Sequence, residues 1–250
     1  MSLLQRPGAA SALLIVVLLL LWQGLYWLVG KDALAPPGET IAYLVQHLAD
    51  PDFRQNIWAT GSAFLVALAI AIAGGLLIGL VMGLSATATE TAEPLLLAAN
   101  SIPKIALYPV VLLLFGIGMS AKVAFGAIHG IIPVAIFTMN ACRAIPPVLV
   151  KTAEVMRLSR ADRIRSILLP AALPDIVTGV RLGFSLTLIG TILGEMFGSQ
   201  NGLGYLLMTA IGLQNTQMIM AVTLLLIVFA AGISTVLLAW EQRLRNVRAR

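Results

Sequence analysis

The feature that most constrains the fold of this chain is a basic segment enclosed by two long apolar runs. Residues 151–174 read KTAEVMRLSRADRIRSILLPAALP and carry one lysine and four arginines. The run Val123–Cys142 precedes this segment and contains no Asp, Glu, Lys or Arg, and a second apolar run, Ile176–Gly194, follows it. Runs of about 20 apolar residues are long enough to cross a bilayer. The basic segment therefore lies at one membrane face, where it either fixes topology or forms a docking surface for a soluble partner.

Composition places the whole chain in the membrane. Hydrophobic residues make up 59% of the 250 residues and charged residues only 11%. Soluble domains carry roughly 25% charged residues, so we expect an integral membrane protein with one membrane domain over residues 1–250. The net charge of +5 does not indicate nucleic acid, because the basic residues lie beside the spans, where they set orientation. The lone Cys142 excludes an intrachain disulfide and a cysteine-based metal cluster.

Six apolar segments are long enough to be spans. They are Ser11–Val29, Ile57–Leu84, Ser101–Gly118, Val123–Cys142, Ile176–Gly194 and Met218–Trp240. The third contains Pro103 and Pro109. Proline kinks a helix, and the membrane tolerates this only where protein or water satisfies the freed carbonyl. The third span is therefore either a broken helix beside a solute path or a helix with a packing kink.

The N-terminal region resembles a secretory signal peptide, with Arg6 before an apolar run and residues 33–35, Ala-Leu-Ala, after it. However, Pro36 would follow the cleavage point, and the run Leu13–Val29 is long enough to span. We expect a retained first helix. Within Pro36–Arg54, apolar residues recur at helical spacing, which predicts a short interfacial helix before the second span.

The distribution of basic residues predicts the orientation. With six spans and a cytoplasmic N-terminus, 13 basic residues fall on the inner side and three on the outer side. The inner set is Arg6, Lys104, Arg143, Lys151, Arg157, Arg160, Arg163, Arg165, Arg181, Arg243, Arg245, Arg248 and Arg250, and the outer set is Lys31, Arg54 and Lys122. Both termini are therefore predicted to be cytoplasmic. The outer connection Gly198–Gln217 contains no Lys or Arg.

Glycines recur at four-residue spacing in two rows. The rows are Gly75, Gly79 and Gly83, and Gly190, Gly194 and Gly198. Four residues is about one helical turn, so each row lies on one helix face and lets a neighbouring backbone approach closely. The rows predict a compact bundle.

Enzymatic motifs are absent from the sequence. It contains no P-loop, no H-E-x-x-H and no G-x-S-x-G. The ionisable residues near or within the spans are few: His129, Arg181, Glu195 and Lys104. Scattered groups of this kind do not form a proton relay by themselves, so an enzyme is not predicted.

Three of these groups have alternative interpretations. His129 is either a functional group within the membrane or a neutral side chain that bonds a neighbouring helix. Glu195 ends the fifth span and is either part of an external gate or an interfacial carboxylate in water. Arg181 begins the same span, and we expect it to extend its charged end towards the inner interface.

The segment after the fourth span resembles the EAA loop, the cytoplasmic loop of binding-protein-dependent ABC importer permeases. The family pattern is E-A-A, three residues, G, nine residues, then I-x-L-P. With Ile167–Pro170 aligned to I-x-L-P, Ala153 matches the second alanine, whereas Lys151, Thr152 and Arg157 depart from E, A and G. These departures concern the details of the partner contact.

Three further stretches support the resemblance, which covers about residues 50–240. Residues 101–118, with SIPK and FGIG, are similar to the third-span signature of the nitrate/sulfonate/bicarbonate-type subfamily. Residues 170–182 (PAALPDIVTGVRL) are similar to that subfamily as well, as are Glu195 and residues 202–204 (GLG). All four motifs occur in the family's order and at matching spacing.

The resemblance implies an all-α polytopic membrane protein, like a type I ABC importer permease, with six transmembrane helices and a cytoplasmic coupling loop at about residues 143–175. Within the loop, a helix expected over Pro147–Arg157 would insert into a cleft on an ATPase subunit. Pro170 and Pro174 would stop the following segment and redirect the chain. The residues assigned to the ATPase contact are Lys151, Ala153, Glu154, Met156, Arg157, Leu158 and Ser159. Those expected along the path or at its gate are Pro103, Pro109, His129, Gly190, Gly194 and Glu195.

The function that the resemblance implies is that of the permease subunit of an ATP-driven importer in the bacterial inner membrane. It would act as a homodimer, with ATPase subunits inside and a solute-binding protein outside. ATP and Mg²⁺ would bind to the ATPase, and this chain would bind no cofactor. The solute would be small and often anionic, such as a sulfonate, nitrate or bicarbonate, although relatives also carry pyrimidine, vitamin or aromatic-acid compounds.

Two other transport functions remain as alternatives. A secondary active transporter would carry its own coupling-ion site, which inverted repeats and acidic residues within the membrane would indicate. The spans are almost free of carboxylates, which argues against ion coupling. An ABC exporter component is the other alternative, and the loop signature favours import.

Overall fold

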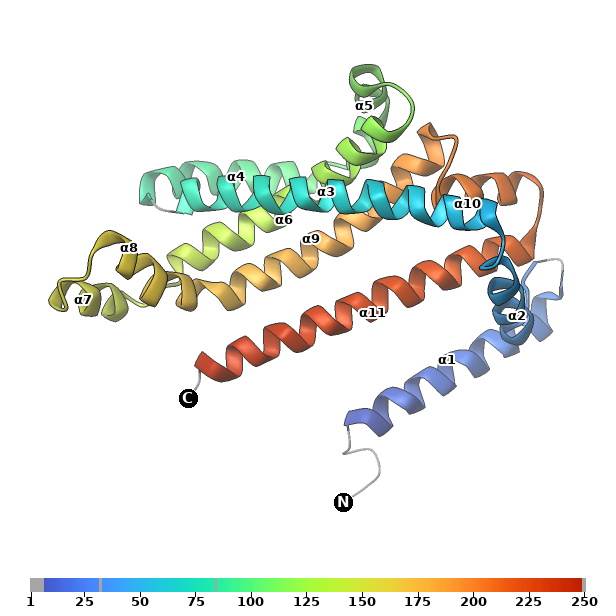
Figure 1. Ribbon diagram of the computed structural model, residues 1–250, viewed down its shortest axis with the longest axis horizontal. Helices are drawn as coiled ribbons and strands as arrows, with labels where there is room; N and C mark the ends of the chain where they lie inside the picture. Colours follow the sequence, from blue (N-terminus) through green and yellow to red (C-terminus); the bar gives the residue numbers. More distant parts are fainter. Residues whose placement is uncertain (1–6, 32, 84, 249–250) are drawn as a thin grey trace.

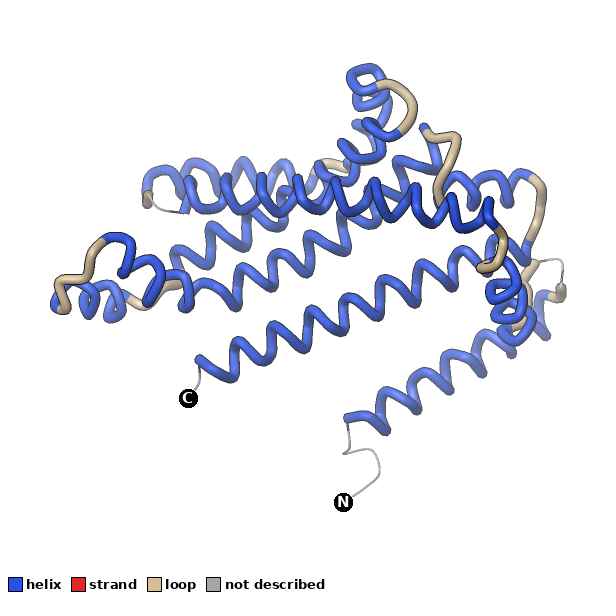
Figure 2. Tube along the Cα trace, viewed as in Figure 1, coloured by secondary structure: helices blue, strands red, loops and turns tan. Residues whose placement is uncertain are grey.

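The computed structural model describes residues 7–31, 33–83 and 85–248, and each regular element within these ranges is helical (Figures 1 and 2). Arg6, Leu84 and Arg250, which the sequence placed in flanks or spans, lie outside the described residues. The elements are α1 (Pro7–Val29), α2 (Pro37–His47), α3 (Pro51–Gly83), α4 (Ala86–Ser101), a 3-10 turn (Lys104–Leu107), α5 (Tyr108–Phe115), α6 (Met119–Arg143), α7 (Pro147–Val155), α8 (Arg160–Arg163), a π segment (Ile164–Leu168), α9 (Leu169–Gly198), α10 (Leu203–Gly212) and α11 (Thr216–Arg248).

Five of the described helices are long and apolar enough to cross a membrane, and a bent helix pair passes the same test when its two halves are counted as one span. The pair consists of Thr87–Ser101 and Lys104–Phe115, which meet at 84°. Counted as one span, the pair begins in α4, so the predicted start of the third span at Ser101 was wrong. The break agrees with the alternative of a broken helix, and the solute path beside it stays a prediction. The break follows from Pro103, which forces the preceding Ile102 into an extended conformation with φ −65° and ψ 130°.

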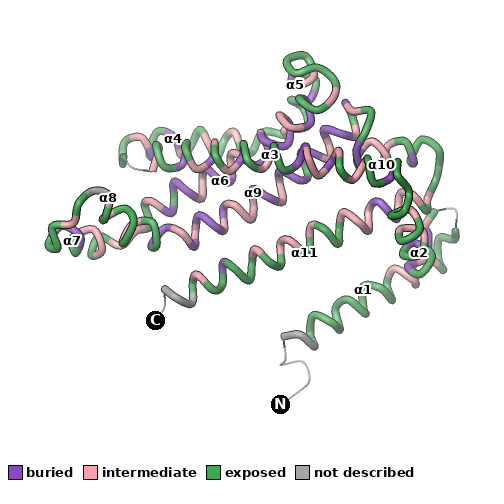
Figure 3. The backbone as a smooth tube through the Cα atoms, viewed as in Figure 1, coloured by how far each residue is buried: buried purple, intermediate pink, exposed green. Residues whose placement is uncertain are grey.

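The core of the bundle is α6, which packs against α3 on one side and α9 on the other. Figure 3 shows that buried positions follow α6 and α9 along their length. The first glycine row fits against α6 so closely that a methyl group at Gly75 would lie 2.5 Å from Cβ of Val134. The same group at Gly79 would lie 2.5 Å from Cβ of Thr138. Tight packing by this row, as the spacing predicted, is confirmed.

Helix α1 lies at the periphery (Figure 1), whereas α11 lies outside the α3, α6 and α9 core but packs against α9 and contributes the buried Val222 to an apolar cluster. None of the most apolar 18-residue window of α1 is buried, and only 11% of that of α11 is buried. The helix predicted within Pro36–Arg54 is confirmed as α2, Pro37–His47, which begins with proline in its first turn, and its interfacial location stays a prediction. Trp22 Nε1 donates a hydrogen bond to the Ala35 carbonyl at 3.0 Å and ties α1 to the start of α2.

The return from the loop to the membrane differs from the expectation. Ile164–Gly198 forms one continuous helical span of 35 residues, so Pro170 and Pro174 do not redirect the chain. Pro170 is the second residue of α9 and follows the π segment Ile164–Leu168, with which α9 is continuous. Pro174 lies inside α9, and membrane helices accommodate such positions. The second half of the predicted coupling loop therefore already belongs to the fifth span.

Candidate functional site

The coupling loop projects beyond the end of the bundle at which α6 ends and α9 begins (Figure 1). Its first helix, α7, has Pro147 in its first turn and ends at Val155, two residues before the predicted end. Arg157 explains the early end, because its φ is +51°. The N–H of Arg157 donates to the Glu154 carbonyl at 3.0 Å, and the N–H of Leu158 donates to the Ala153 carbonyl at 3.1 Å. This is a Schellman C-cap, whose left-handed position usually holds glycine.

The C-cap gives a structural reason for the sequence pattern. Arg157 aligns with the glycine of the EAA pattern, and it has the left-handed conformation that glycine adopts without strain. The substitution of arginine for the glycine of the pattern therefore changes the side chain, whereas the backbone conformation is the one that glycine favours. The alignment of the loop to the motif thus agrees with the backbone geometry.

The predicted coupling residues divide into one buried position and a set of outward-facing ones. Ala153 is 1% exposed and faces the rest of the loop. Lys151, Glu154, Met156, Arg157 and Ser159 are exposed, and Leu158 is half-buried. Large apolar side chains also lie on the outside of α7: Val148, Val155 and Met156. A solvent-facing helix with an apolar exposed surface is a candidate contact for another protein.

Two polar contacts hold the turn after α7. Ser159 Oγ donates to Asp162 Oδ2 at 2.6 Å and accepts from the Asp162 N–H at 3.2 Å. Arg163 and Glu154 form an ion pair at 3.6 Å. Among the coupling candidates, Ser159 and Glu154 thus stabilise the loop itself.

The residues predicted along the path lie in two groups. Pro103 and Pro109 are exposed on the broken span, where Pro103 marks the break and Pro109 occupies the first turn of α5. His129, in contrast, is buried in α6, where its Nδ1 donates to the Phe125 carbonyl at 2.8 Å. A methyl group at Gly190 would lie 2.8 Å from Cγ of His129, so the second glycine row also allows close packing on α6.

Lys104 lies elsewhere than the sequence predicted. It was assigned to the inner membrane face, but it begins the short turn at the break, between the two halves of the bent span. The misassignment arose because α4 carries Glu90 and Glu93, which made this half of the span look like a polar connection. Lys104 therefore does not contribute to the positive-inside count.

Glu195 is the centre of a buried polar network, and the interpretation as an interfacial carboxylate in water was wrong. Its carboxylate is 0% exposed and pairs with Lys122 at 3.2 Å. Its second oxygen accepts from Thr60 Oγ1 at 2.7 Å and from the Gly204 N–H at 3.0 Å. Lys122 Nζ also donates to Asn201 Oδ1 at 2.9 Å. Lys122 is thus a buried ion-pair partner and not an exposed outer charge.

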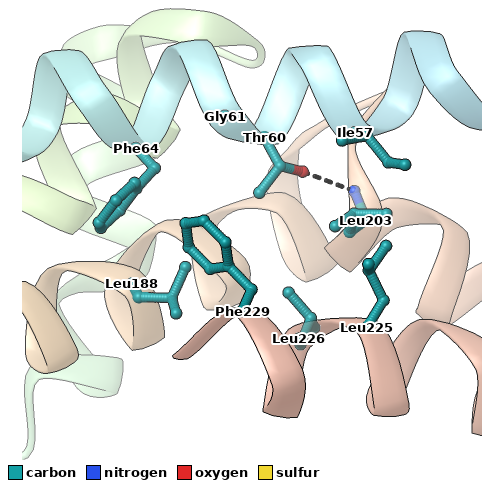
Figure 4. Close-up of a pocket in the computed structure, with 9 residues that line it drawn as sticks. All are labelled: Ile57, Thr60, Gly61, Phe64, Leu188, Leu203, Leu225, Leu226 and Phe229. Atoms are coloured by element: carbon teal, nitrogen blue, oxygen red, sulfur yellow. Dashed lines mark hydrogen bonds between the residues drawn. The ribbon is translucent and has the colours of Figure 1, made fainter. Parts of the chain in front are cut away.

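The network extends into the outer connection. Thr60 accepts a hydrogen bond from the Leu203 N–H at 2.7 Å, a contact drawn in Figure 4. Asn56 Oδ1 accepts from the Gly202 N–H at 2.6 Å. Gly202 has φ +113°, and a side chain there would overlap the Glu195 carboxylate. We call Asn56, Thr60, Lys122, Glu195 and Asn201 the outer latch.

The outer latch joins α3, α6 and α9 to the beginning of α10. A buried ion pair requires close geometry and further hydrogen bonds, because both charges have left water. Both are present here, and removal of one partner from such a pair leaves an uncompensated buried charge. Of its members, the sequence identified Glu195 alone as a site residue. The sequence indicated a partner for Glu195 only through Lys122, which carries the opposite charge at the outer end of the neighbouring span.

A second network lies at the opposite end of α9. Arg181 pairs with Glu241 of α11 at 3.0 Å, so it does not simply extend towards the interface as expected. Glu241 also accepts from Thr178 at 2.8 Å and from Arg245 at 3.2 Å. Arg245 pairs in turn with Asp175 at 3.1 Å. We call these five residues the inner network, and nothing in the sequence indicated that Glu241 belongs to it.

An apolar recess of about 100 Å³ lies between α3, α9, α10 and α11 (Figure 4). Its lining residues are Ile57, Thr60, Gly61, Phe64, Leu188, Leu203, Leu225, Leu226 and Phe229. The one hydroxyl in this lining, that of Thr60, is already bonded within the outer latch. The recess therefore offers no free polar group to a solute. Among the described residues, no group of His, Cys, Asp and Glu side chains could hold a metal ion.

Comparison with known families identifies the architecture. Residues 71–246 match the family described as "Binding-protein-dependent transport system inner membrane component". The chain belongs to this family. It is a multi-pass inner-membrane permease of the ABC importer type, as the loop and span motifs predicted.

Three curated relatives show how this permease compares with others. The taurine transport system permease protein TauC of Escherichia coli (strain K12) is 26% identical over 96% of this chain and 90% of TauC. The riboflavin transport system permease protein RibX of Chloroflexus aurantiacus is 34% identical over 61% of this chain and 59% of RibX. The nitrate import permease protein NrtB of Synechococcus elongatus is 24% identical over 82% of this chain and 77% of NrtB.

A solved structure shows the same fold. A chain of the MetNI methionine ABC transporter, in an inward-facing conformation, aligns with a TM-score of 0.66 and 20% identity. The alignment covers 82% of this permease and 97% of that chain. The aligned part of this permease thus has the fold of a chain of an ABC transporter.

Proposed function

We propose that this permease forms a homodimer that passes a small anionic solute from an external binding protein into the cytoplasm. The observation that carries the proposal is the coupling loop, which places an exposed helix with an apolar outer surface beyond the end of the bundle. Taurine and nitrate in the names of TauC and NrtB support an anionic or sulfonate-bearing solute. RibX, whose name refers to riboflavin, supports the broader class of small polar solutes.

In this proposal, ATP and Mg²⁺ bind to ATPase subunits, and α7 transmits their closure to the spans. The contact is made by the outward-facing members of the loop, Lys151, Met156 and Arg157, while Ala153 holds α7 against the loop. Glu195 and Gly194 belong to the external gate through the outer latch, and His129 and Gly190 lie deeper on the same helix pair.

The proposed orientation has both termini in the cytoplasm. Removal of Lys104, Arg181 and Lys122 from the charge count leaves 11 inner basic residues against two outer ones, so the bias supports the same orientation. Figure 1 shows the N-terminal end of α1 and the C-terminal end of α11 pointing towards the end of the bundle that carries α7 and α8.

The test of this function is uptake by a reconstituted complex. The permease, its ATPase and its binding protein are placed in liposomes, and uptake of taurine, ethanesulfonate and nitrate is measured with internal and external ATP. We expect uptake that needs ATP on the side of the coupling loop and that stops with an ATPase unable to hydrolyse ATP. Uptake by the permease alone, driven by a sodium or pH gradient, would instead establish the secondary transporter.

Ala153→Asp tests the loop within the same complex. Because Ala153 is 1% exposed, a carboxylate there either stays buried without a partner or pulls α7 away from the loop. We expect at least a tenfold loss of solute-stimulated ATP hydrolysis and faster protease cleavage of the loop. Ala153→Ser is the matched control, since it adds a small neutral group. Normal coupling with Ala153→Asp in an assembled complex would show that α7 is not the lever.

A further inference from the structure

The break in the third span carries an unpaired positive charge. Lys104 Nζ donates one hydrogen bond, to the Asn100 carbonyl at 3.1 Å. An ammonium group has three N–H donors, so two remain available. Among the described residues, no carboxylate pairs with Lys104, whereas Lys122, Arg143 and Arg181 each pair with a glutamate. Lys104 is thus the exception among these basic side chains.

Lys104 lies at the break of the bent pair, away from both of its ends. It joins the halves Thr87–Ser101 and Lys104–Phe115 of the bent span. Tyr108, in the helix that follows Lys104, packs against Phe125 of α6 (Met119–Arg143), and the two ring centroids lie 5.1 Å apart. Other basic residues for which no carboxylate partner is described lie near helix ends or in the coupling loop: Lys31, Arg54, Lys151, Arg157, Arg165 and Arg243.

An ammonium group at the break of a membrane span requires water or a polar solute. Ionisable residues within the membrane almost always face a cavity or the interior of an assembly, because exposure to hydrocarbon is costly. Lys104 is half-buried, and its neighbours Ser101 and Pro103 are exposed. The break also interrupts the regular helical hydrogen bonding, which membrane proteins accept where the backbone lines a path or is buried in protein. The charge of Lys104 and the interrupted backbone at the break thus both indicate that a polar path lies beside this position.

We propose that Lys104 is the charge-selecting residue of the translocation path and contacts the sulfonate, carboxylate or similar oxyanion of a solute at the break. The inference rests on the proposed transport function and predicts that the solute is negatively charged. A fixed cation without a partner attracts an anion and repels a cation, and this effect is strongest where little water screens it. In a homodimer, each protomer supplies one such charge.

The lone cysteine makes a direct test practicable. Cys142→Ser gives a cysteine-free permease, into which Ile105→Cys places a thiol next to Lys104. The complete complex is treated with two thiol reagents of similar size, sulfonatoethyl and trimethylammonioethyl methanethiosulfonate. The measured quantity is the ratio of their reaction rates, anionic over cationic. Co-purification of the ATPase confirms that each variant assembles.

We expect Lys104→Met to lower this ratio by about tenfold at position 105, and Lys104→Arg to preserve it. Leu113→Cys is the control position, because it is exposed on α5 several residues further along the span, beyond the screening length of about 8 Å. Its ratio is expected to stay unchanged in Lys104→Met. Lys31→Met, which removes an exposed charge elsewhere, is expected to leave both ratios unchanged.

Two results would overturn the inference. One is an equal ratio at position 105 with and without Lys104, and the other is no reaction at position 105 in a complex that takes up solute. Failure of the transport function is distinct, since it appears as absent ATP-dependent uptake by the unmodified complex, whatever the labelling ratio. Support for the inference extends to solutes if Lys104→Met reduces uptake of ethanesulfonate.

Discussion

Two ion-pair networks lie at opposite ends of α9, and they differ in their contact with water. In the outer latch, the side chains of Lys122 and Glu195 are 2% and 0% exposed. In the inner network, Glu241 is 8% exposed, but its partners Arg181 and Arg245 are 28% and 51% exposed. The same pairing of charges therefore occurs once with both charges buried and once with the basic partners reaching solvent.

The solvent exposure of the two networks indicates which end of the bundle is held more firmly by its polar contacts. In the outer latch, both charges are buried, so each depends on its protein partner. In the inner network, the arginines reach solvent, so water can take over part of each contact. The outer ends of α3, α6 and α9 are thus held in one arrangement, whereas the inner ends of α9 and α11 can exchange partners at lower cost.

The largest expected effect is from Glu195→Gln. The substitution keeps a side chain of the same shape but leaves the Lys122 ammonium buried without its counter-charge. We expect the free energy of unfolding to fall by about 3–5 kcal/mol, measured by reversible unfolding in mixed micelles. The control is Glu93→Gln, which removes an ion pair with Arg143 that is well exposed, and about 1 kcal/mol or less is expected there.

A double variant tests whether the loss of stability comes from the unpaired Lys122 charge. Lys122→Met combined with Glu195→Gln removes both charges and should recover part of the loss, since no buried charge then lacks a partner. An effect of Glu195→Gln as small as that of Glu93→Gln would show that water reaches the outer latch.

A smaller effect is expected from Glu241→Gln in the inner network. The two arginines lose a charged acceptor but remain hydrated, and we expect a loss of about 1.5–3 kcal/mol. The salt dependence of these losses distinguishes the two networks, because salt screens exposed charges far more than buried ones. Raising the ionic strength should shrink the effect of Glu241→Gln and leave that of Glu195→Gln nearly constant. Equal salt dependence of both variants would contradict the distinction between the buried network and the one that reaches solvent.

The smallest expected effect, and one of opposite sign, is from Arg157→Gly at the end of α7. Glycine adopts the left-handed conformation without the penalty of about 1–2 kcal/mol that other residues carry. We expect slower hydrogen exchange in the loop, because its C-cap is stabilised. Arg165→Gly is the matched control, since Arg165 lies in the helical segment before α9, where glycine costs about 1 kcal/mol. Faster exchange in Arg157→Gly would show that the arginine side chain contributes more than its backbone strain.

The sequence was sufficient to predict those parts of the fold that depend on continuous apolar runs and on local chain geometry. Five of the predicted spans, the interfacial helix α2 and the start of α7 at Pro147 follow directly from apolar length, helical spacing and proline position. The third span was misplaced because α4 carries glutamates that pair elsewhere, as Glu93 does with Arg143. Local polarity in this case concealed a membrane helix.

The outer latch could not be predicted for a different reason. Lys122 and Glu195 are 73 residues apart in the chain, and each is adjacent to a membrane boundary, where a charge normally needs no partner. Thr60 and Asn201 carry no signal at all until α3 and the outer connection are brought together. Long-range polar pairing depends on helix packing, which the glycine rows indicated without giving the register.

The peripheral position of α1 limits how strongly the rest of the chain constrains its amino-acid sequence. Its apolar window has no buried residue, and one described hydrogen bond, from Trp22, ties it to the start of α2. The rest of this chain therefore constrains its length and apolarity and very little of its residue order. Any stricter conservation of residue order along α1 must originate outside the protomer, from lipid or from another chain.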